Sequence, residues 1–315
     1  MNESFKLATV SSAGSRPFVS LVLDGTSVGL EATSAKAGVH LPCDTMMTLL
    51  EDWDASFDKL VKVAAWVRRE GLASPRLKDA VAPIGAVHIH APIPRPPTMF
   101  FAAVNYPRPA GRNAPPPPGV TRRPHIFEKT ARCVIGPYDD IVKPREYADI
   151  DWEVELALVI GRGGKRISAA KAMDHVAGYT IANDVTCRDF RKHGELAIPG
   201  PDWFGSKCHD GFAPLGPYFT PRVFVPDCRN LRLTLKVNGE MRQDGNTKDM
   251  TFSPEQQIEH VAHHLTLQPG DIFSTGTPEG IAMLTGARYL GVGDVMETEI
   301  EGLGVQRNKL VAEGN

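Results

Sequence analysis

Three acidic side chains, Glu153, Glu155 and Asp184, have the clearest chemical potential in this sequence, because each is embedded in apolar residues. The first two stand in the segment 151–156 (DWEVEL), and the third follows the apolar segment 176–181. Carboxylates that meet away from water repel one another and resist burial, and a bound cation is the simplest compensation. Hard divalent cations such as Mg²⁺ prefer carboxylate oxygens. The three residues are therefore predicted to bind a divalent metal ion.

Two strands must position these carboxylates. Residues 152–160 read as a strand, in which Glu153 and Glu155 share one face while Trp152 and Val154 lie on the other. A second strand, predicted at 176–182, ends just before Asp184. On spacing alone the alternative is an acidic strand face exposed to solvent, which needs no metal.

Composition limits the kinds of partner. The chain has 315 residues with 35 basic and 37 acidic side chains, so its net charge of −2 gives no reason to expect nucleic acid or an anionic membrane as partner. No apolar run reaches the roughly 18 residues needed to span a bilayer, and the polar N-terminus lacks a signal-peptide pattern. Five scattered cysteines without a C-x-x-C pair favour a reducing, cytoplasmic location.

A proline-rich segment at 91–97 (APIPRPP) is the predicted domain boundary, because repeated proline stops helices and central strands. Residues 1–92 are predicted to form a small α+β domain. Its predicted elements are strands at 5–9 and 17–23, a hairpin turn at Asp24-Gly25 and a helical pattern at 44–72.

Residues 98–315 are predicted to form a second, larger domain that is rich in strands. Asn238-Gly239 indicates a hairpin turn, and Ser253 with Pro254 indicates the start of a capped helix over 253–265. Several strands, few helices and abundant Gly and Pro indicate a β-rich α+β fold. The predicted strands cover 99–104, 152–160, 176–182, 231–237 and 295–301.

An ordered series of short motifs runs through this second part, and together the motifs are far more specific than any one alone. They are NY at 105–106, FEK at 127–129, DWEVEL at 151–156, NDVTCRD at 183–189, SKCHDGFAPLGP at 206–217, VNG at 237–239, LQPGD at 267–271 and TGTPEG at 275–280. Through them residues 98–310 resemble the fumarylacetoacetate hydrolase superfamily. The first 90 residues are similar to the small domain attached in many bacterial members.

The resemblance implies a mixed β-roll or sandwich catalytic domain, usually in a homodimer, with Mg²⁺, Mn²⁺ or Ca²⁺ held by Glu153, Glu155 and Asp184. It also implies a small 2-oxo or β-diketo acid as substrate. Members hydrolyse carbon–carbon bonds in acylpyruvates, decarboxylate oxaloacetate-like acids, or isomerise and hydrate dienoates.

Further site residues follow from the same resemblance, each with a structural alternative. Lys207 is expected to stabilise an oxyanion, or else to be a surface cation. Arg188 is expected to hold a carboxylate or the shell of metal ligands, or else to pair with Asp189. Thr277 is expected to donate its hydroxyl to substrate, or else to serve a tight turn only. Tyr106 is expected to contact substrate.

The chain departs from the family where many members carry an N-Y-x-x-H-x-x-E run, whose His and Glu activate water. Pro109 and Arg112 occupy those two positions. Three histidines are candidate replacements for the missing base: His193 first, because its loop could close over a site, then His209 and His125.

The leading functional hypothesis is metal-dependent hydrolysis of a carbon–carbon bond in an acylpyruvate-type acid. The alternatives are an oxaloacetate-type decarboxylase or a dienoate isomerase or hydratase. The missing dyad favours a decarboxylase or an isomerase, because neither reaction needs activated water. A protein that binds a metal and a 2-oxo acid without catalysis is the third hypothesis.

Overall fold

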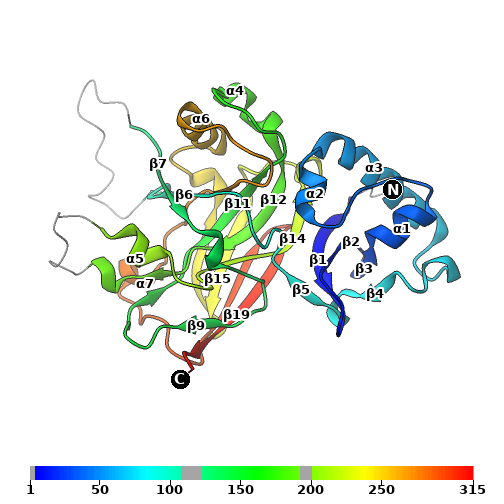
Figure 1. The fold of residues 1–315 in the computed structure, drawn as a ribbon. Helices are drawn as coiled ribbons and strands as arrows, with labels where there is room; N and C mark the ends of the chain where they lie inside the picture. The colour runs from blue at the N-terminus through cyan, green and yellow to red at the C-terminus, as the bar shows by residue number, and fades with distance from the viewer. Residues whose placement is uncertain (1–3, 108–121, 192–200, 315) are drawn as a thin grey trace.

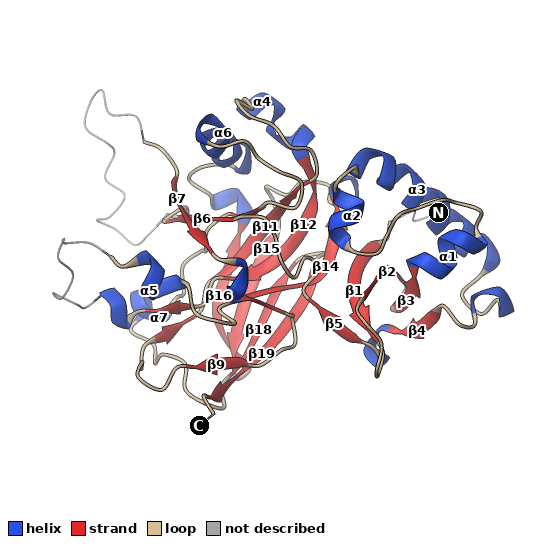
Figure 2. Cartoon of the chain, in the orientation of Figure 1, coloured by secondary structure: helices blue, strands red, loops and turns tan. Residues whose placement is uncertain are grey.

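The computed structural model describes residues 4–107, 122–191 and 201–314. Its strands form a twelve-stranded sheet, a five-stranded sheet and a two-stranded pair. The strands fill the middle of the molecule and the helices lie mostly around them (Figure 2). The predicted β-rich α+β fold is therefore confirmed. No helix in the described ranges is both long and apolar enough to cross a membrane.

The N-terminal part forms as its sequence pattern predicts. Both central residues of the turn at Asp24-Gly25 have positive φ, 47° and 73°, as a two-residue hairpin requires. The helical pattern at 44–72 divides into two helices. The Asp52 side chain accepts a hydrogen bond from the Ala55 backbone N–H and so caps the start of the second helix, which begins at Trp53. The elements are β1 (Lys6–Ser11), β2 (Phe18–Leu23), β3 (Thr26–Gly29), α1 (Leu30–Lys36), α2 (Met46–Leu50), α3 (Trp53–Glu70), η1 (Pro75–Leu77), β4 (Val81–Pro83), η2 (Ile84–Ala86) and β5 (His88–His90).

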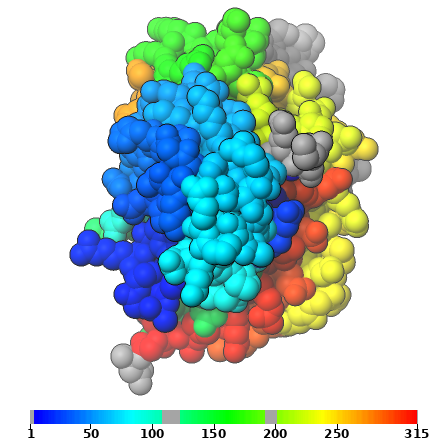
Figure 3. Space-filling view, turned by 90° about the vertical axis from the view of Figure 1, so that its right-hand side faces the viewer, coloured from blue at the N-terminus to red at the C-terminus, as the bar shows by residue number. Residues whose placement is uncertain are grey.

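This part shares a sheet and a core with the rest of the chain. Strand β1 pairs antiparallel with β14 (Ala213–Pro221), where Leu7 is opposite Phe219. Ala157 and Val159 pack in the same core as the N-terminal strands and helices. The N-terminal third, blue to cyan, covers much of one face of the molecule (Figures 1 and 3). A boundary at 92–98 stays a prediction about the chain, and the folded parts are continuous across it.

The large sheet continues through strands of the second part, in the order β1-β14-β12-β11-β17-β6-β7. Strands β11 and β12 are central, and each of their residues is buried. The predicted strand at 152–160 begins only at Val154, since the Glu153 backbone N–H donates to the Asn183 side chain at 3.0 Å. The strands of the large sheet in this part, besides β14, are β6 (Met99–Ala103), β7 (His125–Lys129), β8 (Val134–Ile135), β11 (Val154–Ile160), β12 (Val176–Asn183) and β17 (Ile272–Ser274). The two-stranded pair consists of β10 (Ile150–Asp151) and β13 (Thr186–Cys187).

A five-stranded sheet packs on the large one, so that Leu156 of β11 shares a core with Leu233 and Met296. It consists of β16 (Glu240–Asn246), β15 (Arg232–Val237), β18 (Val295–Ile300), β19 (Gly304–Ala312) and β9 (Ile141–Lys143). The predicted capped helix is α6 (Pro254–His264), with a full capping box between Ser253 and Gln256. The other helices are α4 (Ala169–Ala172), α5 (Trp203–Lys207), α7 (Ala282–Thr285), η3 (Ala131–Cys133), η4 (Met173–His175), η5 (Asp189–Arg191), η6 (Arg222–Phe224) and η7 (Thr247–Asp249).

Candidate active site

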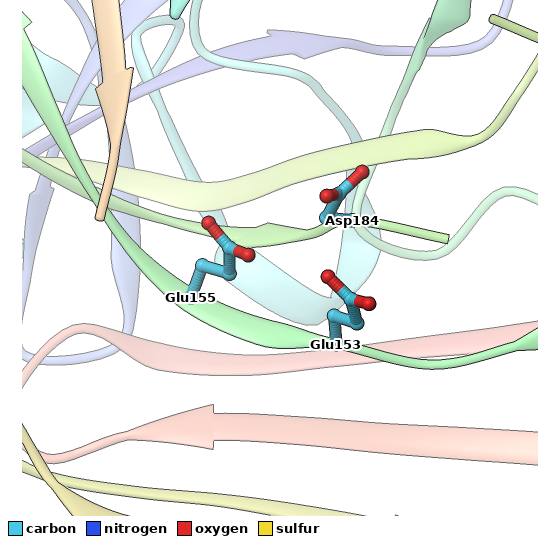
Figure 4. A group of neighbouring side chains, drawn as sticks. All are labelled: Glu153, Glu155 and Asp184. Atoms are coloured by element: carbon cyan, nitrogen blue, oxygen red, sulfur yellow. The ribbon is translucent and has the colours of Figure 1, made fainter. Parts of the chain in front are cut away.

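The structure brings Glu153, Glu155 and Asp184 together. One carboxylate oxygen of each lies within 4.8 Å of the others, and Figure 4 shows the three carboxylates around a common space. Pairing of β11 with β12 causes this, because Val154 is opposite Asn183 and so the residue before one strand meets the residue after the other. All three residues are buried, with 8%, 1% and 1% exposed. The alternative of a solvated acidic strand is therefore wrong.

The electrostatics of this acidic triad fit a divalent cation. Burial, together with the nearby charges of Asp184 and Glu153, raises the pKa of Glu155 well above its usual value. One oxygen of Glu155 is fixed by the Ser274 hydroxyl at 2.6 Å and the Gly276 backbone N–H at 2.9 Å. Hard cations take carboxylate oxygens and relieve such repulsion, so the donor set suits Mg²⁺ or Mn²⁺.

Lys207 joins two of the carboxylates. Its Nζ lies 3.0 Å from Glu153 Oε2, 2.5 Å from Asp184 Oδ2 and 2.6 Å from Thr186 Oγ1. Burial lowers the pKa of Lys207, but the charges of Asp184 and Glu153 outweigh burial and raise it. With only 2% exposed, Lys207 is no surface cation.

Arg188 forms hydrogen bonds to Asp151 and to Glu153 of the triad. Its Nε donates to Asp151 Oδ2 at 2.9 Å and its Nη2 to Glu153 Oε1 at 2.5 Å. Burial opposes ionisation of Glu153, but Lys207 and Arg188 together lower its pKa to about 2. The alternative pair with Asp189 does not form in the described structure, because Asp189 accepts from the backbone N–H groups of residues 148 and 149.

A second buried lysine, Lys129, was missed as a site residue. Its Nζ donates to Asp184 Oδ1 at 2.7 Å and to the backbone carbonyls of Val185 and Phe212 at 3.1 and 2.6 Å. The signal was present in the FEK motif, since residues 125, 127 and 129 of a strand share one face. The Phe127 ring on that face lies 5.3 Å from Lys207 Nζ.

A cavity of about 220 Å³ opens beside the triad. Its polar lining residues include the predicted residues Tyr106, Arg188, Lys207 and Thr277, together with Glu153. Its apolar lining residues include Val104, Phe127, Trp203, Pro278, Ile281 and Leu284. The Trp203 ring stacks on Phe127 with centroids 4.8 Å apart. A small acid with polar groups and an apolar part matches this mixed lining.

Comparison with known proteins decides the family. The model of the fumarylacetoacetate (FAA) hydrolase C-terminal domain matches residues 98–311. The chain belongs to the fumarylacetoacetate hydrolase family. Relatives of this family member include mitochondrial oxaloacetate tautomerases, FAHD2B of Bos taurus at 38% identity and FAHD2A of Homo sapiens at 37%, each over 92% of this chain and 88% of the relative. Family membership and this kinship make the chain an enzyme of the family that acts on ketonic substances.

Solved structures of the fumarylacetoacetate hydrolase family support the same fold. A putative HpcE protein from Mycobacterium smegmatis has a TM-score of 0.76 at 29% identity, over 97% of this chain and 99% of the other. A maleylpyruvate hydrolase from Sphingobium sp. SYK-6, in complex with manganese(II) and pyruvate, has a TM-score of 0.74 at 25% identity, over 98% and 100%. The cytoplasmic location, the homodimer and magnesium as the metal stay predictions.

Thr277 and Tyr106 both line the cavity of this family member, and their hydroxyl groups differ in hydrogen bonding. The Thr277 hydroxyl donates to the Val154 carbonyl at 2.8 Å and accepts from Gln243 Nε2 at 2.9 Å, so its donation to substrate stays a prediction. The Tyr106 hydroxyl is buried and has no hydrogen-bond partner among the described residues. It is therefore available to a ligand.

The candidate bases are only partly placed. His193, like Pro109 and Arg112 of the missing dyad, lies outside the described residues. His209 Nε2 lies 2.6 Å from the Gly205 carbonyl, and burial lowers the pKa of this histidine. Its ring packs on Phe212, with centroids 4.7 Å apart. His125 is the one histidine among the described residues that line the cavity.

Proposed function

We propose that this enzyme interconverts the keto and enol forms of a small 2-oxo dicarboxylic acid of the oxaloacetate class. The observation that carries the proposal is the buried acidic triad, which contacts Lys207 in the lining of a small cavity. Relatives named as oxaloacetate tautomerases, at 37–38% identity, support this reaction over the others. Tautomerisation needs proton transfer and no activated water, which agrees with Pro109 and Arg112 at the dyad positions.

In this proposal Glu153, Glu155 and Asp184 hold Mg²⁺ or Mn²⁺, and Ca²⁺ shares the same preference for oxygen ligands. When bound, the cation would withdraw electrons from the 2-oxo group and so acidify the neighbouring carbon. Arg188 keeps Glu153 ionised and oriented through its 2.5 Å bond. Arg188 and Lys129 thus help to fix the orientation of two of the three carboxylates.

Lys207 and the apolar lining have separate roles. The Lys207 ammonium, which donates to Glu153, Asp184 and Thr186 in the described structure, would redirect one N–H to the oxygen on which negative charge develops in the enolate. Phe127 and Trp203 cover the apolar part of the cavity and limit the access of water. Tyr106, whose buried hydroxyl lacks a described partner, can bind another substrate oxygen.

Hydrolytic cleavage of an acylpyruvate is the second candidate. A neighbour of similar fold is named a maleylpyruvate hydrolase and was solved with manganese and pyruvate, which supports this chemistry in a related scaffold. Hydrolysis also needs a base for water. His193 stays the predicted base, and His125 is the described histidine that reaches the cavity. Decarboxylation of oxaloacetate and binding without catalysis are the remaining candidates.

One experiment separates these candidates. Enolic oxaloacetate is added to the Mg²⁺- or Mn²⁺-loaded protein, loss of enol absorbance is followed, and proton NMR detects pyruvate or, from acylpyruvates, cleaved acids. Glu155→Gln keeps the shape and the acceptor for Ser274 but removes a charge, whereas Glu299→Gln changes an exposed strand residue. We expect only Glu155→Gln to abolish the metal-dependent acceleration.

Other outcomes point elsewhere. Cleaved acids from an acylpyruvate, lost in Glu155→Gln, would establish the hydrolase. Pyruvate formed from oxaloacetate faster than with free metal would establish the decarboxylase. Turnover that survives in Glu155→Gln would contradict the role of the triad.

A further inference from the structure

The hydroxyl groups in the cavity divide into two kinds. Thr186 and Thr277 are fully engaged: the Thr186 hydroxyl donates to the Asp184 carbonyl at 2.8 Å and accepts from Lys207, and Thr277 bonds to Val154 and Gln243. Ser206 and Tyr106 are the opposite case. Their hydroxyls are buried, 3% and 4% exposed by residue, and have no hydrogen-bond partner in the described ranges. The protein therefore leaves two cavity hydroxyls for something else.

Ser206 has local acceptors that it does not use. A serine inside a helix commonly donates to a carbonyl three or four residues earlier. In α5 the Asp202 carbonyl accepts the Ser206 backbone N–H at 3.0 Å, and the Ser206 side chain makes no such bond. A buried hydroxyl without a partner is unfavourable, because it loses its hydrogen bonds to water and gains none in the protein. A ligand oxygen in the cavity would remove that penalty.

The position of Ser206 tells which part of a ligand it would meet. Ser206 lies three residues after Trp203, so the two share one side of α5. The Trp203 ring lies against Phe127 and against His125, with centroids 4.8 and 5.2 Å apart, and all three residues line the cavity. Lys207, the residue after Ser206, reaches the triad itself. Ser206 is thus next to Lys207 in sequence and beside Trp203 on α5.

Tyr106 lines the same cavity, together with Glu153 and Lys207, and its buried hydroxyl is the second one without a described partner. Ser206, beside Trp203 on α5, suits a substituent of the bound acid that extends toward Trp203.

We propose that the Ser206 hydroxyl donates a hydrogen bond to the distal carboxylate of a 2-oxo dicarboxylic acid and so selects such acids over their monocarboxylic counterparts. The inference rests on the proposed function for the class of acid. It adds a specificity residue at a position of the SKCHDG motif to which the sequence assigned no role. The donor is neutral, so it distinguishes the two classes by one hydrogen bond rather than by a full ion pair.

The test measures binding without turnover. L-Malate and L-lactate are 2-hydroxy acids that cannot tautomerise, and they differ by the distal carboxylate. Their affinities for the Mn²⁺-loaded wild type and for Ser206→Ala are measured by titration calorimetry. Thr180→Val is the matched control, because Thr180 also has a buried hydroxyl without a described partner but does not line the cavity.

We expect the wild type to bind malate more tightly than lactate. Ser206→Ala should weaken malate roughly tenfold, as loss of one hydrogen bond to a charged group predicts, and change lactate less than about twofold. Thr180→Val should change neither, and all three proteins should bind Mn²⁺ equally.

Three results would overturn the inference: equal weakening of malate and lactate in Ser206→Ala, no change for either, or a wild type without preference for malate. Equal effects in Thr180→Val would assign the loss to the scaffold and overturn it as well. Failure of the proposed function gives a different result. If Ser206→Ala weakens malate alone but the wild type does not tautomerise oxaloacetate, only the proposed tautomerase activity is refuted.

Discussion

Lys129 offers a sharp test of how the site is held together. Its side chain is wholly buried and gives three hydrogen bonds, one to Asp184 and two to the backbone carbonyls of Val185 and Phe212. Lys129→Met keeps most of the length and the apolar stem while removing the charge. Asp184 retains Lys207 on its other oxygen, but the two carbonyls lose this donor.

The expected loss is large. Breaking a buried ion pair by removing one partner costs about 3–5 kcal/mol, whereas an exposed pair contributes about 0–1 kcal/mol. Lys171→Met is the control, because the Lys171 side chain is 74% exposed and lies 3.7 Å from Asp174. At about 1.5 °C per kcal/mol for a chain of 315 residues, Lys129→Met should lower the melting temperature by at least ~4 °C and the control by much less.

Urea unfolding of the metal-free proteins measures the difference, and a melting curve with added Mn²⁺ gives a second reading. We expect Mn²⁺ to raise the melting temperature of Lys129→Met more than that of wild type, because the cation replaces the positive charge that Lys129 placed beside Asp184. A variant within about 1 kcal/mol of Lys171→Met would refute the claim that Lys129 neutralises a buried carboxylate.

Three further changes test the scaffold. Gly280→Ala should cost about 3 kcal/mol in urea unfolding, because φ is +105° and a Cβ would clash with a backbone carbonyl at 2.0 Å, while Gly302→Ala at +76° with open space should cost about 1 kcal/mol. Thr277→Val should lower the unfolding free energy by about 1–3 kcal/mol through two lost hydrogen bonds. Burial opposes ionisation of Asp294, but Arg288 outweighs it and the pKa falls to about 2. The ionised Asp294 therefore stabilises the fold at pH values above its unfolded pKa of about 4, and this contribution is lost as pH falls through 2. Asp294→Asn should flatten the acid-unfolding curve between about pH 4 and pH 2.

The sequence determined the local elements well, for reasons that act over a few residues. Apolar runs predicted β11 and β12, the Asn238-Gly239 turn joined β15 to β16, and Ser253 marked the start of α6. Strand alternation also placed Glu153 and Glu155 on one face. The position of Asp184 after an apolar segment predicted it as the third ligand, and the resemblance to a family implied the same three residues.

Contacts between distant segments decided the rest. The ammonium of Lys129 meets Asp184 across 55 residues, and a spacing rule for strands or helices reaches only a few. Local patterns also do not predict that one sheet runs through both parts of the chain. The proline-rich segment indicates where helices and strands end, but it carries no information on the pairing of β1 with β14.

The hydroxyls show the division most clearly. From sequence, Thr277 was the expected donor to substrate and Ser206 had no role. Only the folded chain shows that the Thr277 hydroxyl donates its hydrogen bond to the Val154 carbonyl while the Ser206 hydroxyl has no described partner. Residue type fixes what a side chain can donate, but the tertiary structure decides which groups are already satisfied, because hydrogen bonds depend on atoms brought within about 3 Å.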